Sequence, residues 1–460
     1  MNSNTNISSL KVTIMGLGLH GGGLASTIFF AEKGANVLVT DLRDKKVLQP
    51  ILNKLKKYNI KYILGEHRNE DFINADLVIK NPAVPAVSPY LKLAKHIETD
   101  ISVFLKFNKR PVIAVTGSKG KSTTVSAIYH VFSKLNIDAK LGGNITTSPL
   151  NFIDDCLIPD SDPVILELSS WQLADLKGMN LLKPGISVIT NIMPDHQNRY
   201  SSMDEYVADK KLIYADQSKD DILICNFDDK YGHVFSKGNC SKTLFISDKP
   251  FPENTEGAFL DNGRGYSFVS GVKKEILSQE LLIPGRHNKL NLLYAALVLQ
   301  MSGIDPADIR SNLKSFNGIP HRMELVAIKH GVKWYNDSAS TIPQATSAAL
   351  KGAEGPVTLI AGGTDKKLDF QGTIEAFKLA KNIYLLEGSA TNRLMEHLKK
   401  TNIPFKGPFD KLENIVRIVS KESNKGDSII FSPGATSFGM FNNEFDRGDK
   451  FRQMVLDLPM

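Results

Sequence analysis

A glycine turn at residues 117–120 lies between an apolar strand pattern and a helix pattern, and its residue types suit phosphate binding. Backbone N–H groups of such a turn bind phosphate oxygens, a lysine adds a point charge, and the first hydroxyl group of the helix binds Mg²⁺. Lys121 and Ser122 stand at the positions for the last two roles. Only two residues separate Gly117 from Gly120, fewer than in the usual loop. The pattern predicts a shortened nucleoside triphosphate loop, with a plain glycine-rich turn as the alternative.

A carboxylate lies in the next apolar run of this segment. Residues 164–168 are typical of a buried strand, and Glu167 sits near its end. An unpaired charge in such a place costs several kcal/mol, so it needs a cation. Mg²⁺ held between Ser122 and the phosphates would satisfy Glu167. A partly exposed glutamate at a strand end is the alternative interpretation.

Two further residues near strand and helix patterns are less decisive. His196 follows the strand pattern at 186–191, and its position fits either a second metal ligand or, more simply, a structural histidine. Lys210 lies in an amphipathic helix pattern at 206–214, whose lysines would ordinarily be solvated. Periodicity alone does not single out any one of these lysines.

The start of the chain has the pattern of a βαβ unit. A strand pattern at 11–15 precedes the turn Gly-x-Gly-x-x-Gly at 16–21, then a helix pattern to about Lys33 and a second strand pattern at 36–40. Asp41 at the end of that strand could bind a ribose hydroxyl group of a dinucleotide. This pattern alone does not distinguish between a nicotinamide site, a site for another nucleotide ligand and a purely structural turn.

Bulk properties limit the class of protein. At 460 residues the chain suggests about two to four domains. The net charge of +7 fits an enzyme of phosphorylated, carboxylated substrates about as well as weak nucleic-acid contact. Three cysteines without metal-ligand spacing, no apolar signal core and no apolar stretch long enough for a bilayer predict a soluble cytoplasmic protein.

Three blocks of alternating strand and helix patterns follow one another along the chain. The first ends near Thr99, the second holds the phosphate loop, and the third starts around Pro320 with strand patterns at 357–361, 382–386 and 428–432. Ligands of open parallel sheets gather beyond the carboxyl ends of strands, so polar residues after these strands are site candidates. Polar clusters occur in the third block at residues 320–322, 335–338 and 362–366. Such clusters at strand ends or domain joints suit a cleft between domains.

Taken together, the motifs resemble those of the Mur ligases of peptidoglycan synthesis, over essentially the whole chain. The motifs that carry this resemblance lie at 116–123, 166–170, 195–196, 284–288, 321–322, 336–338 and 432–435. The resemblance implies an α/β fold with three domains. These are a Rossmann-like UDP-binding domain at 1–99, a central P-loop-type ATP-binding domain at 100–319 and a C-terminal Rossmann-like amino-acid-binding domain at 320–460.

Within the family, the chain is most similar to the glutamate-adding members. The resemblance implies an ATP-dependent ligase that adds D-glutamate to UDP-N-acetylmuramoyl-L-alanine through an acyl phosphate, and so serves cell-wall synthesis, cell shape and cell division. An L-glutamate-adding variant and another Mur ligase are the close alternatives. From a different class, a nicotinamide-dependent oxidoreductase would explain the first glycine turn but not the phosphate loop. The expected partners are small molecules, with no nucleic acid and no membrane span, and the expected state is a monomer.

The resemblance also implies roles for single residues. Catalytic roles fall on Lys121, Glu167, His196 and Lys210. Two Mg²⁺ ions, with Mn²⁺ as the alternative ion, would be held by Ser122, Glu167, His196 and Lys210, the lysine carrying a carbamate made with CO₂. ATP contacts are implied for Gly117, Ser118, Lys119, Gly120, Lys121, Ser122, Thr123, Asn288, Asn291, Arg322 and Asp337. Contacts to the UDP substrate are implied for Gly16, Leu17, Gly18, Leu19, Asp41, Leu42, Arg43, Asn81 and Asn144, and contacts to the amino acid for Thr341, Lys366 and Ser437.

Three positions depart from the family pattern. Ala339 stands where the D-glutamate enzymes carry a lysine, and Glu444 stands where they carry an aromatic residue. Both belong to the incoming amino acid's pocket, so the stereochemistry of the glutamate stays open, with the D-form predicted. Asn198 replaces a frequent aspartate near the second metal.

Overall fold

The computed structural model describes residues 6–18, 21–145, 147–193, 200–252, 254–353, 355–364, 370, 372–437 and 440–459. Its contacts divide the chain into two compact units. The first comprises Met1–Leu277 and Asn291–Ile309, and the second comprises Ser278–Leu290 and Arg310–Met460. The domain boundaries expected at 99/100 and 319/320 stay a prediction.

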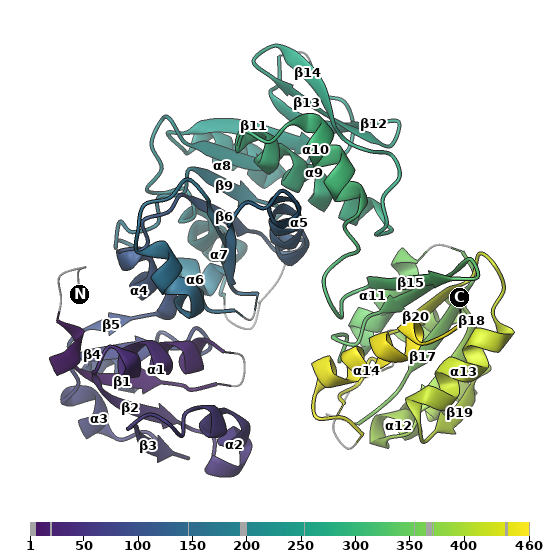
Figure 1. The fold of residues 1–460 in the computed structure, drawn as a ribbon, viewed down its shortest axis with the longest axis horizontal. Helices are drawn as coiled ribbons and strands as arrows, with labels where there is room; N and C mark the ends of the chain where they lie inside the picture. Colours follow the sequence, from purple (N-terminus) through teal and green to yellow (C-terminus); the bar gives the residue numbers. More distant parts are fainter. Residues whose placement is uncertain are drawn as a thin grey trace. The chain divides into compact units, whose positions relative to one another are not determined.

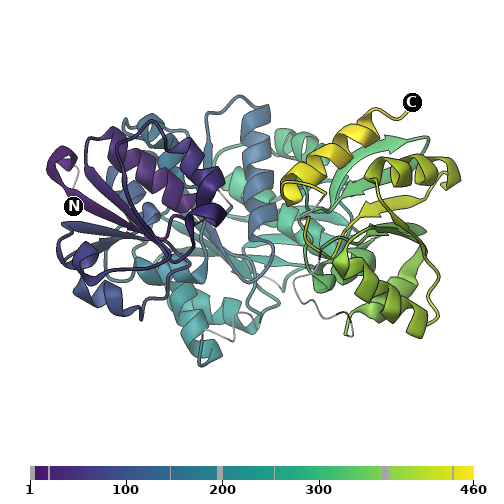
Figure 2. The same ribbon diagram turned by 90° about the horizontal axis from the view of Figure 1, so that it is seen from below.

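The first unit begins with a five-stranded parallel sheet of order β3-β2-β1-β4-β5, with helices on both faces (Figures 1 and 2). Its strands are β1 (Lys11–Met15), β2 (Asn36–Asp41), β3 (Lys61–Leu64), β4 (Leu77–Lys80) and β5 (Ile97–Glu98). Its helices are α1 (Gly22–Glu32), α2 (Lys45–Lys54) and α3 (Asn69–Ile73). The predicted βαβ opening is confirmed. Gly16 and Gly18 have φ of +88° and +66°, values that suit glycine in the turn after β1.

The same unit contains a nine-stranded sheet of order β14-β13-β12-β11-β10-β9-β6-β8-β7. Its parallel strands are β6 (Val112–Thr116), β7 (Lys140–Gly143), β8 (Val164–Glu167), β9 (Ile186–Ile189), β10 (Ile222–Asn226), β11 (Lys242–Ser247) and β12 (Gly257–Asp261). An antiparallel hairpin of β13 (Arg264–Val269) and β14 (Val272–Leu277) extends β12. β8 and β9 pair with the two sides of β6, so the ends of these three strands meet at one edge.

Helices connect and cover the strands of this central sheet. They are α4 (Asp100–Phe107), α5 (Lys121–Lys134), α6 (Ser170–Asp175), α7 (Met203–Lys211) and α8 (Lys230–Lys237). α9 (Arg286–Met301) and α10 (Pro306–Lys314) cross the division between the units. α4 begins at a capping box made by Thr99 and Ser102, which satisfies amide groups that the first helical turn leaves unpaired.

One apolar core joins the N-terminal sheet to the central sheet. It includes Phe29 and Phe30 of α1, Phe104 of α4 and Ile153 of the 3₁₀ helix η3 (Pro149–Cys156). The Phe29 and Phe107 ring centroids lie 6.0 Å apart across this junction. Burial of such side chains contributes roughly 1.5–3 kcal/mol each to the free energy of folding. The shared core therefore stabilises the packing of α1, α4 and η3 against one another.

The second unit contains a six-stranded sheet of order β15-β16-β20-β17-β18-β19, in which only β15 is antiparallel to its neighbour among the described pairs. The strands are β15 (Glu324–Lys329), β16 (Val332–Asn336), β17 (Val357–Ala361), β18 (Ala380–Leu386), β19 (Lys406–Phe409) and β20 (Ser428–Phe431). The helices are α11 (Pro343–Gly352), α12 (Ser389–Lys400), α13 (Leu412–Glu422) and α14 (Glu444–Leu456). Within the described ranges, no helix combines the length and apolar character needed to cross a membrane.

Candidate active site

The phosphate loop connects β6 to α5, as the sequence predicts. Gly117 and Gly120 have φ of +143° and +87°, conformations that L side chains rarely adopt. A Cβ at Gly117 would overlap Thr190 Oγ1, and one at Gly120 would overlap Asn291 Oδ1. Glycine is therefore required at both ends of the loop by backbone conformation and by space.

Asn191 binds the middle of this loop. Its carbonyl oxygen accepts from Ser118 N at 2.9 Å, and its Oδ1 accepts from Lys119 N at 3.0 Å. Its Nδ2 and Thr190 Oγ1 both donate to Lys119 O, at 3.1 and 2.6 Å. Two loop amides that were expected to face phosphate are thus bonded within the chain. Phosphate would meet chiefly the first turn of α5, where amide groups have no partner within the helix.

The cationic side chain of the loop folds back on it. Lys121 Nζ donates to Gly117 O at 2.9 Å and to Ser118 O at 3.2 Å. Ser122 and Thr123 follow in the first turn of α5 and are half-buried. These positions place a positive charge and two hydroxyl groups at the loop, the set expected for phosphates and a metal ion.

Glu167 ends β8 and is 1% exposed. Asn144 Nδ2 donates to its Oε1 at 3.0 Å, whereas its Oε2 has no hydrogen-bond partner among the described residues. Gly143, with φ +105°, lets the chain pass close to the Glu167 carbonyl oxygen. The partly exposed glutamate considered from the sequence is wrong, because the side chain is buried with one oxygen unsatisfied.

Lys210 on α7 is also buried, at 1% exposure. Its Nζ donates to Gly117 O at 2.9 Å and to Thr116 Oγ1 at 3.3 Å, and it lies 4.7 Å from the centroid of the Tyr206 ring. Tyr206 OH in turn lies 2.9 Å from Ser118 Oγ. The expectation of a solvated lysine from helical periodicity is wrong, because α7 packs directly against the phosphate loop.

His196 and the departure Asn198 lie outside the described residues. No group of three or more His, Cys, Asp or Glu side chains suited to a metal ion occurs in the described part of the chain. The predicted ligands that the structure places are Ser122, Glu167 and Lys210.

A cavity of about 910 Å³ lies between the N-terminal sheet and the central sheet of the first unit. Of the nine predicted UDP-substrate residues, seven line it: Gly16, Gly18, Asp41, Leu42, Arg43, Asn81 and Asn144. Leu17 is not among the lining residues and packs in the apolar core at 0% exposure, and Leu19 is not described. Because Asn144 both lines the cavity and bonds Glu167, the cavity reaches the edge of the sheet that carries the phosphate loop.

Asp41 is tied to its own neighbours. Its Oδ2 accepts from Gly18 N at 3.1 Å, and its Oδ1 accepts from Arg43 N at 2.9 Å. The carboxylate therefore shapes the glycine turn and the following loop, and both oxygens already take part in bonds within the chain.

Other residues of this cavity carry no signal in the sequence. His67, Tyr90, Asp100, Ser148, Trp171 and Gln172 line it. His67 Nδ1 lies 2.7 Å from Thr40 Oγ1, and burial lowers the pKa of its imidazole. Ser148 Oγ donates to Asp100 Oδ2 at 2.8 Å, and burial raises the pKa of that carboxyl group. They come from separate segments, so neither spacing nor a motif indicates them.

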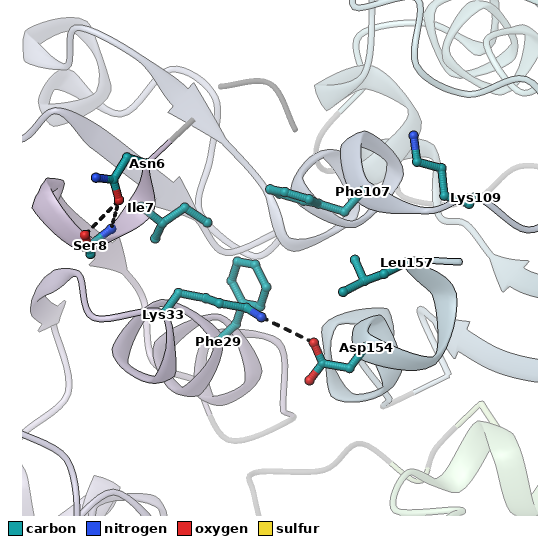
Figure 3. A pocket seen from close by; sticks show the side chains of 9 residues that line it. All are labelled: Asn6, Ile7, Ser8, Phe29, Lys33, Phe107, Lys109, Asp154 and Leu157. Atoms are coloured by element: carbon teal, nitrogen blue, oxygen red, sulfur yellow. Dashed lines mark hydrogen bonds and ion pairs between the residues drawn. The ribbon is translucent and has the colours of Figure 1, made fainter. Parts of the chain in front are cut away.

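A smaller cavity of about 430 Å³ lies at the other end of α1 (Figure 3). Its lining residues include Phe29 of α1, Lys33 just after α1, Phe107 at the end of α4, Asp154 of η3 and Leu157 just after η3. Lys33 Nζ is 3.3 Å from Asp154 Oδ1, and both side chains are exposed, at 42% and 75%. This ion pair joins the same two parts of the unit, and none of the residues that line its cavity belongs to the phosphate loop.

The two predicted ATP contacts on α9 fall in different units. Asn291 is 7% exposed, and its carbonyl oxygen accepts from Thr124 Oγ1 at 3.4 Å. Asn288 lies in the second unit, where its Nδ2 donates to Pro284 O at 2.7 Å. α9 starts at Arg286, so the end of the motif at 284–288 lies in the first turn of this helix.

Asp337 follows β16 in the second unit and is 4% exposed. Its Oδ2 accepts from Ser432 Oγ at 2.6 Å and its Oδ1 from Met323 N at 3.1 Å. Burial outweighs these bonds and raises the pKa of Asp337 to about 6. Arg322 is exposed, and its positive charge opposes this rise.

Arg447 of α14 organises the loops that follow β16 and β20. Its side chain is 1% exposed and donates to Ser338 O at 2.8 Å, to Ser338 Oγ at 3.0 Å and to Ala435 O at 3.1 Å. Burial lowers its pKa to about 10. Ser437 is 4% exposed, and its Oγ has no hydrogen-bond partner among the described residues.

Of the two other residues predicted to contact the amino acid, the structure describes Thr341 but not Lys366. Thr341 is half-buried after the loop that holds Ala339, and Ser338 Oγ donates to the carbonyl oxygen of Glu444 at 2.7 Å. Lys366 lies outside the described residues. Ser437 and Ala339 thus lie in loops at the carboxyl edge of the sheet, and Glu444, the first residue of α14, is bonded to the loop that holds Ala339.

The chain matches two family models. The model described as "Mur ligase middle domain" matches residues 115–299, and the one described as "Mur ligase MurD-like, N-terminal domain" matches residues 10–103.

Curated relatives are similar over nearly the full length. One from Treponema pallidum (strain Nichols) is 40% identical over 96% of this chain and 97% of its own length. One from Borreliella afzelii (strain PKo) is 40% identical over 98% of both chains. Each is named "UDP-N-acetylmuramoylalanine--D-glutamate ligase".

Solved structures show the same fold at low identity. UDP-N-acetylmuramate-alanine ligase MurC from Thermotoga maritima has a TM-score of 0.59 at 19% identity and covers 97% of this chain and 99% of its own. MurF from Acinetobacter baumannii has a TM-score of 0.59 at 13% identity and covers 97% and 93%. With the three sheets described above, they confirm the predicted three-domain α/β architecture.

Proposed function

The chain belongs to the Mur ligase family, and from this premise we propose that it is an ATP-dependent ligase of peptidoglycan precursor synthesis. Its reaction joins the amino group of D-glutamate to the alanyl carboxylate of UDP-N-acetylmuramoyl-L-alanine. The names of the curated relatives support this substrate pair. A nicotinamide-dependent oxidoreductase is set aside, because the family membership extends over both the first glycine turn and the phosphate loop.

One structural observation supports the proposal independently of the names of the curated relatives. Asn144 lines the large cavity and donates at 3.0 Å to Glu167, beside the loop that holds Lys121. A UDP-sugar in the cavity would thus extend toward the site where ATP phosphates bind. That arrangement suits phosphoryl transfer to the far end of the sugar's substituent.

Ser122 and Glu167 suit a Mg²⁺ ion. A buried carboxylate oxygen without a partner among the described residues, as in Glu167, is the kind of oxygen that a hard cation binds. When bound, Mg²⁺ would supply positive charge that offsets the charge of the phosphates. We propose Ser122 and Glu167 as ligands of one ion. His196 and a carbamate on Lys210 are proposed as ligands of a second ion.

A carbamate on Lys210 is part of the same proposal. The Lys210 ammonium group would first lose one proton, and the resulting amine would attack CO₂, forming an N–C bond and releasing a second proton, so that a cation becomes an anion. The carbamate nitrogen keeps one N–H, which could still donate to Gly117 O, now 2.9 Å away. The modified side chain would then offer carboxylate oxygens next to the phosphate loop.

The reaction needs charge neutralisation because two anions must meet. The alanyl carboxylate attacks the γ-phosphorus of ATP, which yields an acyl phosphate and ADP. Lys121 supplies a cation for the transferred phosphoryl group. The amino group of glutamate then attacks the acyl carbon, and a tetrahedral intermediate expels phosphate to leave an amide. Closure of the C-terminal domain would exclude water from the acyl phosphate.

The second unit is proposed to supply the glutamate contacts. The buried Ser437 hydroxyl without a described partner suits a substrate carboxylate, as Thr341 and the cation Lys366 do. Asn288, Asn291, Arg322 and Asp337 are proposed to contact ATP. Activity as a monomer in the cytoplasm is proposed as well.

A phosphate-release assay with UDP-N-acetylmuramoyl-L-alanine and ATP tests the function. D-Glutamate, L-glutamate and meso-diaminopimelate are compared as the third substrate. Release with D-glutamate is expected. Release only with L-glutamate would establish the variant that Ala339 and Glu444 leave open, and release only with the diamino acid would show another member of the family. No release with any of them would refute the proposal.

A further inference from the structure

A buried ion pair joins the two parts of the first unit that contribute the walls of the large cavity. Lys80 Nζ lies 2.6 Å from Asp175 Oδ2, and the side chains are only 3% and 13% exposed. Lys80 is the last residue of β4 in the N-terminal sheet, and Asp175 is the last residue of α6 in the central part of the unit. The reaction uses neither residue.

Both partners lie close to cavity residues along the chain. Asn81 follows Lys80 directly, lines the cavity, and donates its backbone N–H to Met15 O at 3.0 Å. Its side chain is also next to the glycine turn, since a Cβ at Gly18 would lie 3.2 Å from Asn81 Nδ2. A displacement of Lys80 would therefore displace one wall of the cavity.

The other wall continues to the carboxylate of the candidate site. α6 is capped by Ser169, two residues after Glu167, and both Trp171 and Gln172 on this helix line the cavity. The capping box between Ser169 and Gln172 fixes the start of the helix, and the ion pair holds its end. In Figure 1, α6 lies on the side of the central sheet that faces β4 and β5.

We propose that Lys80 and Asp175 are positioning residues that set the spacing between the nucleotide-binding wall of the cavity and Glu167. The inference rests on the proposed function, since it concerns a substrate that reaches from the N-terminal sheet to the phosphate loop. An ion pair suits this role because it fixes one geometry when little water is present, whereas an exposed pair constrains little.

A matched control exists in the same unit. The Lys33–Asp154 pair also joins the end of α1 in the N-terminal part to η3 in the central part, but it is exposed and borders the smaller cavity (Figure 3). Lys33→Met removes a bridge between the same two layers without touching the large cavity. It is expected to change neither turnover nor the affinity for either ligand.

The test uses Lys80→Met, Asp175→Asn and the exchange Lys80→Asp with Asp175→Lys in the full-length chain. Calorimetry measures binding of UDP and of UDP-N-acetylmuramoyl-L-alanine, and phosphate release gives kcat and the KM for ATP. In both single variants, UDP affinity and the KM for ATP should stay unchanged. UDP alone binds at the nucleotide-binding wall and ATP alone binds at the phosphate loop, so neither depends on the spacing between the two. The longer ligand should bind more weakly, and kcat should fall on the order of 10²-fold. The exchange should recover part of the loss.

The outcomes separate this inference from the proposed function. Wild-type protein that neither binds nor turns over the UDP-muramoyl substrate would refute the proposed function, and with it this inference. An active wild type with unchanged kcat and affinity in Lys80→Met would refute the positioning role alone. Equal losses for UDP, ATP and the longer ligand, or variants that do not fold, would also refute it, because the pair would then serve stability only.

Discussion

Asn144 and Glu167 are joined by two hydrogen bonds. Asn144 N donates to the carbonyl oxygen of Glu167 at 2.8 Å, and Asn144 Nδ2 donates to its Oε1 at 3.0 Å. The main-chain bond fixes where the loop after β7 passes β8, and the side-chain bond orients the carboxylate. The second oxygen of Glu167 has no hydrogen-bond partner within the described ranges.

Asn144→Ala should remove the donor that orients Glu167. A hydrogen bond to a charged group contributes about 1.5–3 kcal/mol, so kcat/KM for the UDP substrate should fall about 10- to 100-fold in phosphate-release assays. Asn53→Ala, on the surface of α2, is the matched control and should leave kcat/KM unchanged. Wild-type kcat/KM in Asn144→Ala would show that the contact does not contribute to the reaction.

Lys121→Ala should abolish turnover by removing the cation next to Gly117 O and Ser118 O. Loss of one preorganised charge-stabilising group typically costs about 10²–10³-fold in kcat. Lys134→Ala at the exposed end of the same helix should keep normal kinetics. A Lys121→Ala protein with normal kcat would place the phosphate chemistry elsewhere.

Lys210→Ala should lose activity and regain part of it when a short carboxylate such as acetate is added. The reason is that the added anion would occupy the space of the proposed carbamate beside the phosphate loop. Removal of CO₂ should likewise slow the wild-type enzyme. Lys211→Ala, one residue further along α7, should need no rescue. Full activity of Lys210→Ala without acetate would refute its role as a metal ligand.

Asp337 should make the second unit less stable as the pH rises. Its pKa of about 6 in the folded chain exceeds the ordinary value of 3.8, so between these values the folded state binds more protons than the unfolded state. The free energy of unfolding therefore falls as the pH rises through this window, by an amount on the order of 3 kcal/mol if the group acts alone.

Asp337→Asn cannot ionise and should lack this dependence. Thermal unfolding of both proteins across the window measures it, and the Tm difference should shift in favour of the variant toward pH 6. A constant Tm difference would show that Asp337 ionises normally in the fold.

Local patterns were sufficient for the elements that carry the phosphate loop and for several strands. β1 and β17 have the predicted bounds of 11–15 and 357–361, because each largely apolar run ends at a glycine, Gly16 or Gly362. The sequence also identifies Glu167 as a buried carboxylate in need of a cation, and the structure leaves one of its oxygens without a described partner.

Tertiary contacts decide what the patterns missed. The hairpin of β13 and β14 extends a sheet otherwise built from parallel strands, and its register depends on β12. Lys210 is buried because Tyr206 packs α7 onto Ser118, a contact 88 residues apart in sequence. The cavity residues His67 and Trp171 come to line one cavity only once the N-terminal and central sheets have packed together.

Asn191 fixes the conformation of the shortened loop, a role that additional loop residues would otherwise fill. By accepting from the Ser118 and Lys119 amides, it specifies the loop's shape through contacts within the chain. A receptor that is already in its binding conformation has little conformational freedom left to lose when its ligand arrives. Nucleotide affinity in this enzyme should then reflect contact energy with only a small entropic penalty from the loop.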